Sequence, residues 1–82
     1  MNAVLEKPLV SGARQTLRAL REGRAVRVYI AEDAATQVVE PVRAAADEAE
    51  IPVCSIRTMR ELGRACGLGV GCACAASLRP EG

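Results

Sequence analysis

Short apolar runs alternate with longer helical stretches along this 82-residue chain, and that alternation limits the folds open to it. The runs have the length and the β-branched or small apolar content of strands, and they lie at 8–11, 26–30, 53–56 and 72–78. Helical spacing of apolar residues occurs at 13–22, 36–50 and 59–66. Strands that alternate with helices predict an α/β domain with helices on both faces of one central sheet.

Residues that start and stop helices mark the ends of the first and third helical stretches. Ser11 or Gly12 is expected to cap the first helix, and Gly23 to end it. Thr58 is expected to cap the third helix, where Glu61 completes a capping box.

The second helical stretch contains a proline. Because Pro41 cannot donate a backbone hydrogen bond, the helix either starts near Glu40, with proline in its first turn, or is kinked. The pattern leaves both alternatives open. Apolar spacing predicts one buried stripe on this helix, formed by Val38, Val42, Ala45 and Ala49.

The core has to be built almost without aromatic side chains. The chain contains one Tyr and no Phe or Trp, although half of its residues are hydrophobic. We therefore expect one small domain, residues 1–82, with an aliphatic core. No apolar run reaches the roughly 18 residues that span a bilayer, and the start of the chain lacks a signal-peptide pattern. A cytoplasmic protein without a membrane partner is expected.

The four cysteines fit a structural role better than a chemical one. They lie at Cys54, Cys66, Cys72 and Cys74, without a Cys-x-x-Cys pair, and the chain has no histidine. Zinc sites normally use paired ligands two to four residues apart, so no metal and no cofactor is expected. A disulfide framework is not expected in a chain without an export signal. We expect the cysteines to act as small buried hydrophobic residues.

The sequence also argues against an enzyme, and no catalytic residue is assigned. Without histidine, acid–base chemistry would fall to carboxylates, and six of the ten lie in the acidic stretch 31–51, which includes a solvated helix. The glycine-rich stretch 67–71 lacks the lysine and the serine or threonine of a phosphate-binding loop, and it precedes a strand instead of a helix.

Charge is segregated along the chain. Residues 1–30 carry six basic and two acidic side chains, residues 31–51 one and six, and residues 52–82 four and two. Such asymmetry points to an oriented electrostatic surface, with basic flanks around an acidic middle.

The start of the first helix is the most distinctive basic feature. Arg14, Arg18 and Arg21 follow one another at i, i+4 and i+7, opposite an apolar side formed by Ala13, Thr16, Leu17 and Leu20. Gln15 lies at the edge of this basic stripe, and Gly12 precedes it. A helix N-terminus adds unpaired N–H groups and a positive dipole end, so this segment suits an anionic, hydrogen-bonding partner.

The loop after the third helix has a different character. Gly69 and Gly71 separate the apolar residues Leu68, Val70 and Cys72, so both backbone and small apolar side chains are open to a partner. If the fold brings this loop beside the first helix, the two form one composite site. Structured RNA fits it, because phosphates and base edges need polar groups whereas an unstacked base needs apolar ones.

Four segments carry a resemblance to a known family: 11–20, 28–34, 61–67 and 70–76. In this order and spacing they resemble the L7Ae and L30e ribosomal proteins, and most of all the short bacterial members that bind kink-turn RNA. The resemblance implies a three-layer α-β-α sandwich around a four-stranded mixed sheet. It also implies recognition of the tandem G·A pairs of a kink-turn.

The resemblance assigns the site residue by residue. In archaeal and eukaryotic members a Gly-x-Asn-Glu-x-x-Lys segment contacts the G·A pairs. Gly12 stands at its glycine, Arg14 at its asparagine, Gln15 at its glutamate and Arg18 at its lysine. The short bacterial members are similar here, with a basic residue followed by glutamine. The loop 68–72 matches the family's apolar loop over the kink, where Val70 and Gly71 are central.

We therefore expect a non-enzymatic, monomeric RNA-binding protein whose partner is kink-turn RNA, ribosomal RNA included. The predicted RNA-binding residues are Gly12, Arg14, Gln15, Arg18, Arg21, Leu68, Gly69, Val70, Gly71 and Cys72. Glu32 and Asp33 match a turn near the site and are expected to be structural. The alternative is a protein-interaction or small-ligand module on the same fold, with a partner on the acidic helix near Asp47, Glu48 and Glu50.

Overall fold

The computed structural model describes residues 5–80 and confirms the alternation of strands and helices. The elements are β1 (Leu9–Ser11), α1 (Ala13–Arg21), β2 (Ala25–Ala31), α2 (Thr36–Glu48), β3 (Val53–Ile56), α3 (Met59–Ala65) and β4 (Cys74–Leu78). Within the described residues, no helix is both long and apolar enough to cross a membrane.

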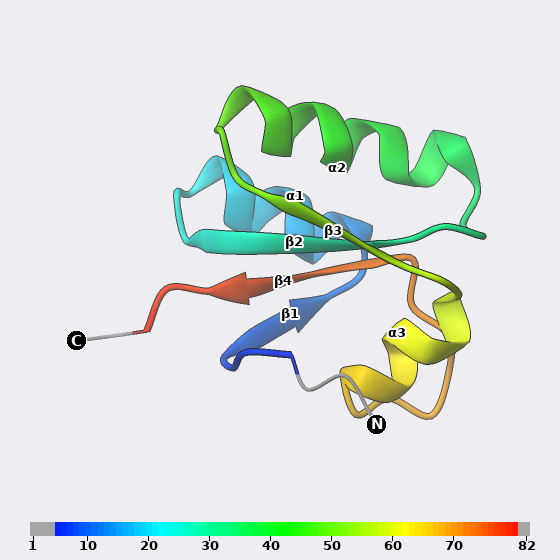
Figure 1. Cartoon of the computed structure of the whole chain (residues 1–82). Helices are drawn as coiled ribbons and strands as arrows, with labels where there is room; N and C mark the ends of the chain where they lie inside the picture. The colour runs from blue at the N-terminus through cyan, green and yellow to red at the C-terminus, as the bar shows by residue number, and fades with distance from the viewer. Residues whose placement is uncertain (1–4, 81–82) are drawn as a thin grey trace.

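The four strands form one mixed sheet in the order β1-β4-β2-β3 (Figure 1). β4 pairs antiparallel with both β1 and β2, whereas β2 and β3 are parallel. β1 lies at an edge, as its proline-led sequence predicts. All five residues of β4 are buried, and their small side chains let both helical layers approach the middle of the sheet.

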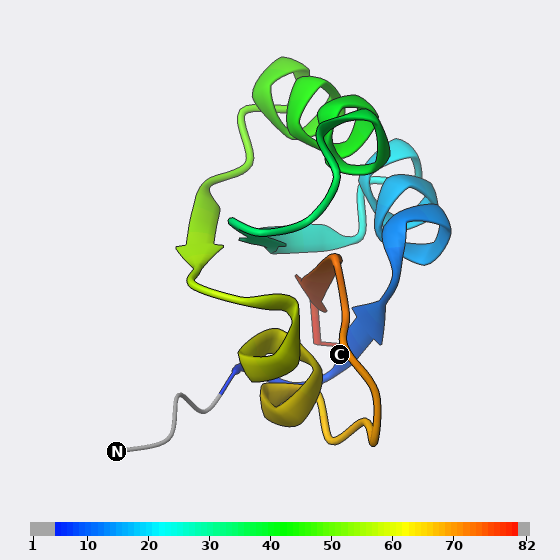
Figure 2. The same ribbon diagram turned by 90° about the vertical axis from the view of Figure 1, so that its right-hand side faces the viewer.

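Helices cover both faces of the sheet, which confirms the predicted three-layer α-β-α sandwich. α1 and α2 pack on one face, and α3 lies on the other (Figure 2). The larger core lies under α1 and α2, and the smaller one is centred on Leu62 of α3, whose side chain is fully buried.

The single aromatic residue of the chain is anchored in the smaller core by a short chain of hydrogen bonds. Ser77 Oγ donates to the carbonyl oxygen of Glu6 over 2.8 Å. Its hydroxyl proton is therefore used, and the buried hydroxyl of Tyr29 donates to Ser77 Oγ over 2.9 Å.

The predicted helix ends are largely confirmed for α1 and α3. Gly12 precedes α1 with a φ of 93°, and Gly23 follows it with a φ of 69°. At α3, the Thr58 hydroxyl accepts a hydrogen bond from the backbone N–H of Glu61 over 3.0 Å, as a capping residue does.

Two predictions about α2 are corrected. The helix begins at Thr36 and continues through Pro41 to Glu48, so a start near Glu40 is wrong. Its buried side is also different, because Val39, Val42 and Ala46 face the sheet. Of the predicted stripe only Val42 is buried, while Val38 is 41% exposed and Ala49 is exposed. α2 carries two neighbouring apolar stripes, and spacing alone cannot tell which one meets the sheet.

The cysteines are free thiols. Cys72 and Cys74 are buried, as predicted, whereas Cys54 and Cys66 are only half-buried.

Candidate nucleic-acid interface

One edge of the sheet gathers segments that lie far apart in the sequence. The backbone N–H of Gly12 donates to the carbonyl oxygen of Cys74 over 2.8 Å, which fixes the start of α1 to the start of β4. The N–H of Ala31 donates to Ala73 over 2.9 Å, which fixes the end of β2 to the loop after α3. The start of α1 and the last residue of this loop therefore lie at the same end of the sheet, next to β4 and β2, while residues 68–71 lie beside α3 (Figure 1).

The start of α1 is open to an acceptor. Gly12 has the positive φ that L side chains rarely adopt, and no side chain caps the helix. The first turn has no acidic residue, and the side chains of Arg14 and Gln15 are exposed. Backbone N–H groups, an amide and a guanidinium thus face solvent together, and they can donate hydrogen bonds to phosphate or base acceptors.

Arg18, one turn further along α1, is held by an acidic neighbour. Its Nε donates to Glu22 over 3.2 Å, and Arg24 donates to the same carboxylate over 3.0 Å. Hydrogen bonds from Arg24 and then Arg18 hold the pKa of Glu22 below its usual 4.5. The carboxylate is therefore ionised at neutral pH, and any anion that binds Arg18 has to compete with it.

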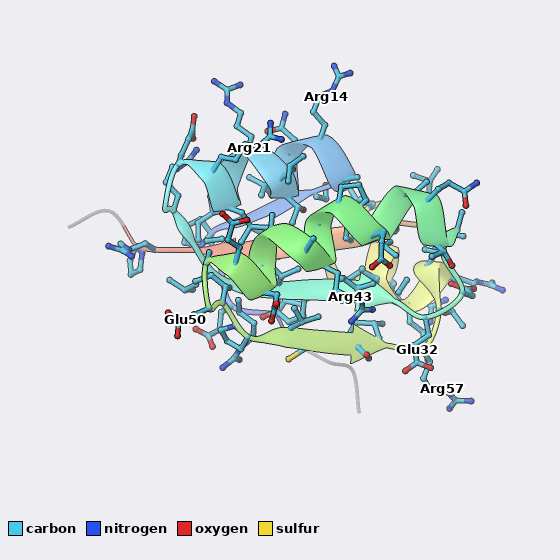
Figure 3. All side chains as sticks on the ribbon, turned by 90° about the horizontal axis from the view of Figure 1, so that it is seen from above. Arg14, Arg21, Glu32, Arg43, Glu50 and Arg57 are labelled. Carbon is cyan, nitrogen blue, oxygen red and sulfur yellow. The ribbon has the colours of Figure 1, made fainter. Side chains whose placement is uncertain are left out.

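Arg21 is exposed on the same outer side of α1 as Arg14 but lies at the opposite end of the helix (Figure 3). Seven residues separate the two arginines, which is roughly 10 Å along a helix. The structure therefore does not bring Arg21 together with Gly12 and the loop.

The loop that follows α3 presents apolar side chains from a firmly held backbone. Val70 is 73% exposed and Leu68 39% exposed. The N–H of Leu68 donates to the carbonyl oxygen of Gly63 over 2.8 Å. A Cβ on Gly63 would overlap the carbonyl oxygen of Val70, so only glycine lets the loop lie this close to α3. Gly69 and Gly71 are exposed, as a partner's close approach to the backbone requires.

Cys72 does not join this exposed surface. The predicted strand 72–78 begins instead at Cys74, and Cys72 is the inward-facing end of the loop. Its side chain is 5% exposed, its backbone N–H donates to Met59, and its thiol donates to the carbonyl oxygen of Cys74 over 2.9 Å. The apolar surface of the loop is therefore made by Leu68 and Val70.

The turn after β2 ties the site to α3. Asp33 Oδ1 accepts a hydrogen bond from the backbone N–H of Met59 over 2.7 Å, and the N–H of Glu32 donates to Ile56 over 2.8 Å. Asp33 thus has the structural role expected of it.

A basic group on α3 and just before it was missed in the sequence, although its spacing of i, i+3 and i+7 could have revealed it. The exposed side chains of Arg57, Arg60 and Arg64 border a hollow of about 380 Å³. Among residues 5–80, no three Cys, Asp or Glu side chains are grouped as a metal site would need. The arrangement offers hydrogen-bond donors, positive charge and exposed apolar groups, which together suit an anionic partner with unstacked bases.

Comparisons with known proteins agree with the resemblance seen in the sequence. The family model described as ribosomal protein L7Ae/L30e/S12e/Gadd45 matches residues 1–82. The chain is 49% identical over 71 residues to RNA-binding protein YbxF of Geobacillus stearothermophilus, which covers 87% of each chain. It is equally similar, at 49% over 71 residues, to RNA-binding protein GK0100 of Geobacillus kaustophilus, with the same coverage of 87%.

The fold has a solved counterpart. The structure of the Giardia lamblia 15.5kD RNA binding protein superposes with a TM-score of 0.82 at 28% identity, covering 89% of this chain. This chain spans 62% of that protein, which is less than two thirds of its length. With a family model that matches from end to end and relatives that are almost half identical, the chain belongs to the ribosomal protein L7Ae/L30e/S12e/Gadd45 family.

Proposed function

We propose that this protein binds RNA and recognises the kink-turn, with the start of α1 and the loop 68–71 acting as one site. The observation that carries the proposal is the hydrogen bond from Gly12 to Cys74, which joins the start of the basic helix to the start of β4, directly after the loop that follows α3. The names of the relatives, RNA-binding proteins of two Geobacillus species, support the same class of partner.

The two halves of the site have different tasks. Arg14, Gln15 and Arg18 contact the edges of the tandem G·A pairs and the neighbouring phosphates, and Gly12 lets the backbone come close. Leu68 and Val70 pack on the base that the kink leaves unstacked, since both side chains are exposed on a loop held against α3.

In this proposal the protein acts in the cytoplasm as a monomer, and the whole chain serves as one ribosomal-protein-like, non-enzymatic domain. Ribosomal RNA is one source of the kink-turn. Arg21 contributes at most a distant phosphate contact, because it lies at the far end of α1.

The test is a titration of the protein with a kink-turn RNA and with a control RNA whose G·A pairs are replaced by Watson–Crick pairs. We expect at least tenfold tighter binding of the kink-turn. Arg18→Ala should weaken binding and lower the slope of log affinity against log salt by about one. Arg43→Ala, at an exposed arginine of α2 that lies toward β3 (Figure 3), is the matched control and should leave both quantities unchanged. Equal affinity for the two RNAs would refute kink-turn recognition.

A further inference from the structure

The seam between α1 and α2 is an apolar groove that the proposed RNA site meets only at Arg14 and Arg18. Figure 3 shows the two helices side by side above the sheet. Two hollows of about 620 and 490 Å³ lie along the seam. They adjoin each other, because both are lined by Leu17, Arg21 and Pro41.

The groove exists because α2 has more apolar surface than the sheet can cover. The inner stripe of α2 (Val39, Val42 and Ala46) packs on the sheet. The second, neighbouring stripe lines the seam instead, through Val38, Pro41, Ala45 and Ala49. Val38 of this second stripe is 41% exposed, and within the described residues the only other exposed large apolar side chains are those of the loop, Leu68 and Val70. An exposed apolar strip beside charged residues is typical of an interaction surface.

Positive charge stands along the α1 side of the groove, whereas Glu48 of α2 lines the smaller hollow. Arg14, Arg18 and Arg21 line the larger hollow, and Figure 3 shows the Arg14 and Arg21 guanidinium groups in solvent on the side of α1 away from α2, from which these long side chains can turn toward the groove. Glu22 is paired with Arg18, whereas Arg14 and Arg21 have no carboxylate within 4.0 Å among the described residues. Two arginines beside the groove are therefore without an acidic partner.

The shape and chemistry of the groove favour a segment of protein over nucleic acid. α1, the shorter of the two helices, is 9 residues long, so the seam extends for roughly 14 Å, the length of about two and a half turns of helix. A phosphate backbone would pair with the arginines but leave Leu17, Val38 and Pro41 uncovered. An amphipathic helical segment can cover the apolar residues and also pair with the arginines, because its apolar side fills the groove while carboxylates on one flank reach the guanidinium groups.

We propose that the groove between α1 and α2 binds an acidic, amphipathic helical segment of a partner protein. The apolar residues of the segment contact Leu17, Val38 and Pro41, and its acidic flank pairs with Arg14 and Arg21. This surface is separate from the loop 68–71 and does not depend on the proposed RNA recognition. Arg14 and Arg18 belong to the RNA site and also line the groove, so an occupied groove is expected to weaken RNA binding modestly.

The test uses two fluorescent helical peptides of about 14 residues, long enough to cover the groove and to extend past both of its ends. One has leucines at i, i+3, i+4 and i+7 with glutamates on one flank, and the other replaces each glutamate with lysine. Anisotropy titrations of the full chain should show at least tenfold tighter binding of the glutamate peptide. Equal affinity for the two peptides, or no binding of either, would overturn the proposal.

Charge and apolar variants locate the binding. Arg21→Glu and Val38→Asp should each lower the affinity for the glutamate peptide at least tenfold. Circular dichroism would verify that both variants stay folded. Arg43→Glu makes the same charge change on the other side of α2 (Figure 3) and should have little effect. Unchanged binding by Arg21→Glu, or equal losses in all three variants, would place the peptide elsewhere and refute the assignment.

Two further measurements separate the other possible occupants. Sedimentation of the protein alone should give a monomer at all concentrations, and a dimer abolished by Val38→Asp would make a second copy the occupant and overturn the proposal. A kink-turn RNA should bind Val38→Asp as tightly as it binds wild type. A loss of RNA affinity in that variant would assign the groove to RNA, whereas weak RNA binding by wild type itself would count only against the proposed function.

Discussion

The contact between Gly63 and the loop gives the sharpest structural prediction. Gly63 lies inside α3 and is buried, and a Cβ there would overlap the carbonyl oxygen of Val70 and lie 3.0 Å from its carbonyl carbon. In a helix without such a neighbour, Gly→Ala stabilises by roughly 0.5–1 kcal/mol. Here the added methyl meets backbone that cannot rotate away, so the loop must move.

We expect Gly63→Ala to lower the free energy of unfolding by about 1–3 kcal/mol, the usual cost of overpacking. For a chain of this size that corresponds to a melting temperature lower by on the order of 10 °C. Urea denaturation would measure this difference in the free energy of unfolding, and the m-value is expected to stay unchanged. RNA affinity should fall as well, because Val70 and Leu68 shift with the loop.

Gly69→Ala, in the loop that Gly63 contacts, is the matched control. Its Cβ would meet nothing within 4 Å, so stability should stay within about 0.5 kcal/mol of wild type. If Gly63→Ala proved as stable as wild type, the close approach of loop and helix would be disproved, and with it the account of how the loop is held.

Three other predictions test the core, the basic helix and the thiols. Ser77→Ala should destabilise the protein more than Tyr29→Phe in thermal unfolding, because it leaves the buried tyrosine hydroxyl without its acceptor. The expected loss in the free energy of unfolding is about 1–3 kcal/mol for Ser77→Ala and about 1 kcal/mol for Tyr29→Phe. Equal losses would contradict the assigned donor. Glu22→Gln should release Arg18 and raise RNA affinity about two- to fivefold with a steeper salt dependence, and unchanged affinity would mean that the ion pair does not compete. Burial, and after it the electrostatic interaction and hydrogen bond with Cys72, raises the pKa of Cys66 from 9.0 to about 11. Since only the thiolate reacts, iodoacetamide at pH 8 should alkylate it roughly 100-fold more slowly than an ordinary thiol, with the rate rising toward pH 11; a rate like that of a free thiol would refute the shift.

Local signals predicted the order and type of every element. Glycines at 12 and 23 and the Thr58 cap act within a few residues, so they can be read without knowledge of the fold. The mixed sheet and the three layers came from the resemblance, because spacing alone does not say which strands pair.

What the sequence could not supply depended on packing between distant elements. Val38 and Val39 are equally apolar, and only the way α2 lies on the sheet buries one and exposes the other. Cys72 was predicted as part of the exposed loop, but the hydrogen bond from its backbone N–H to Met59 holds it on the inner side. Arg21 shares a helix face with Arg14, yet the length of α1 carries it away from the loop.

Kink-turn recognition requires α1 and the loop 68–71 to act together on one kinked RNA. The direct measurement is a map of backbone amide chemical shifts of the ¹⁵N-labelled protein with a kink-turn RNA and with its G·A-replaced control. Large shifts are expected in two segments at once, 12–18 and 68–71, with the kink-turn only. Shifts confined to one segment, centred on the α1–α2 groove, or identical with both RNAs would contradict this expectation.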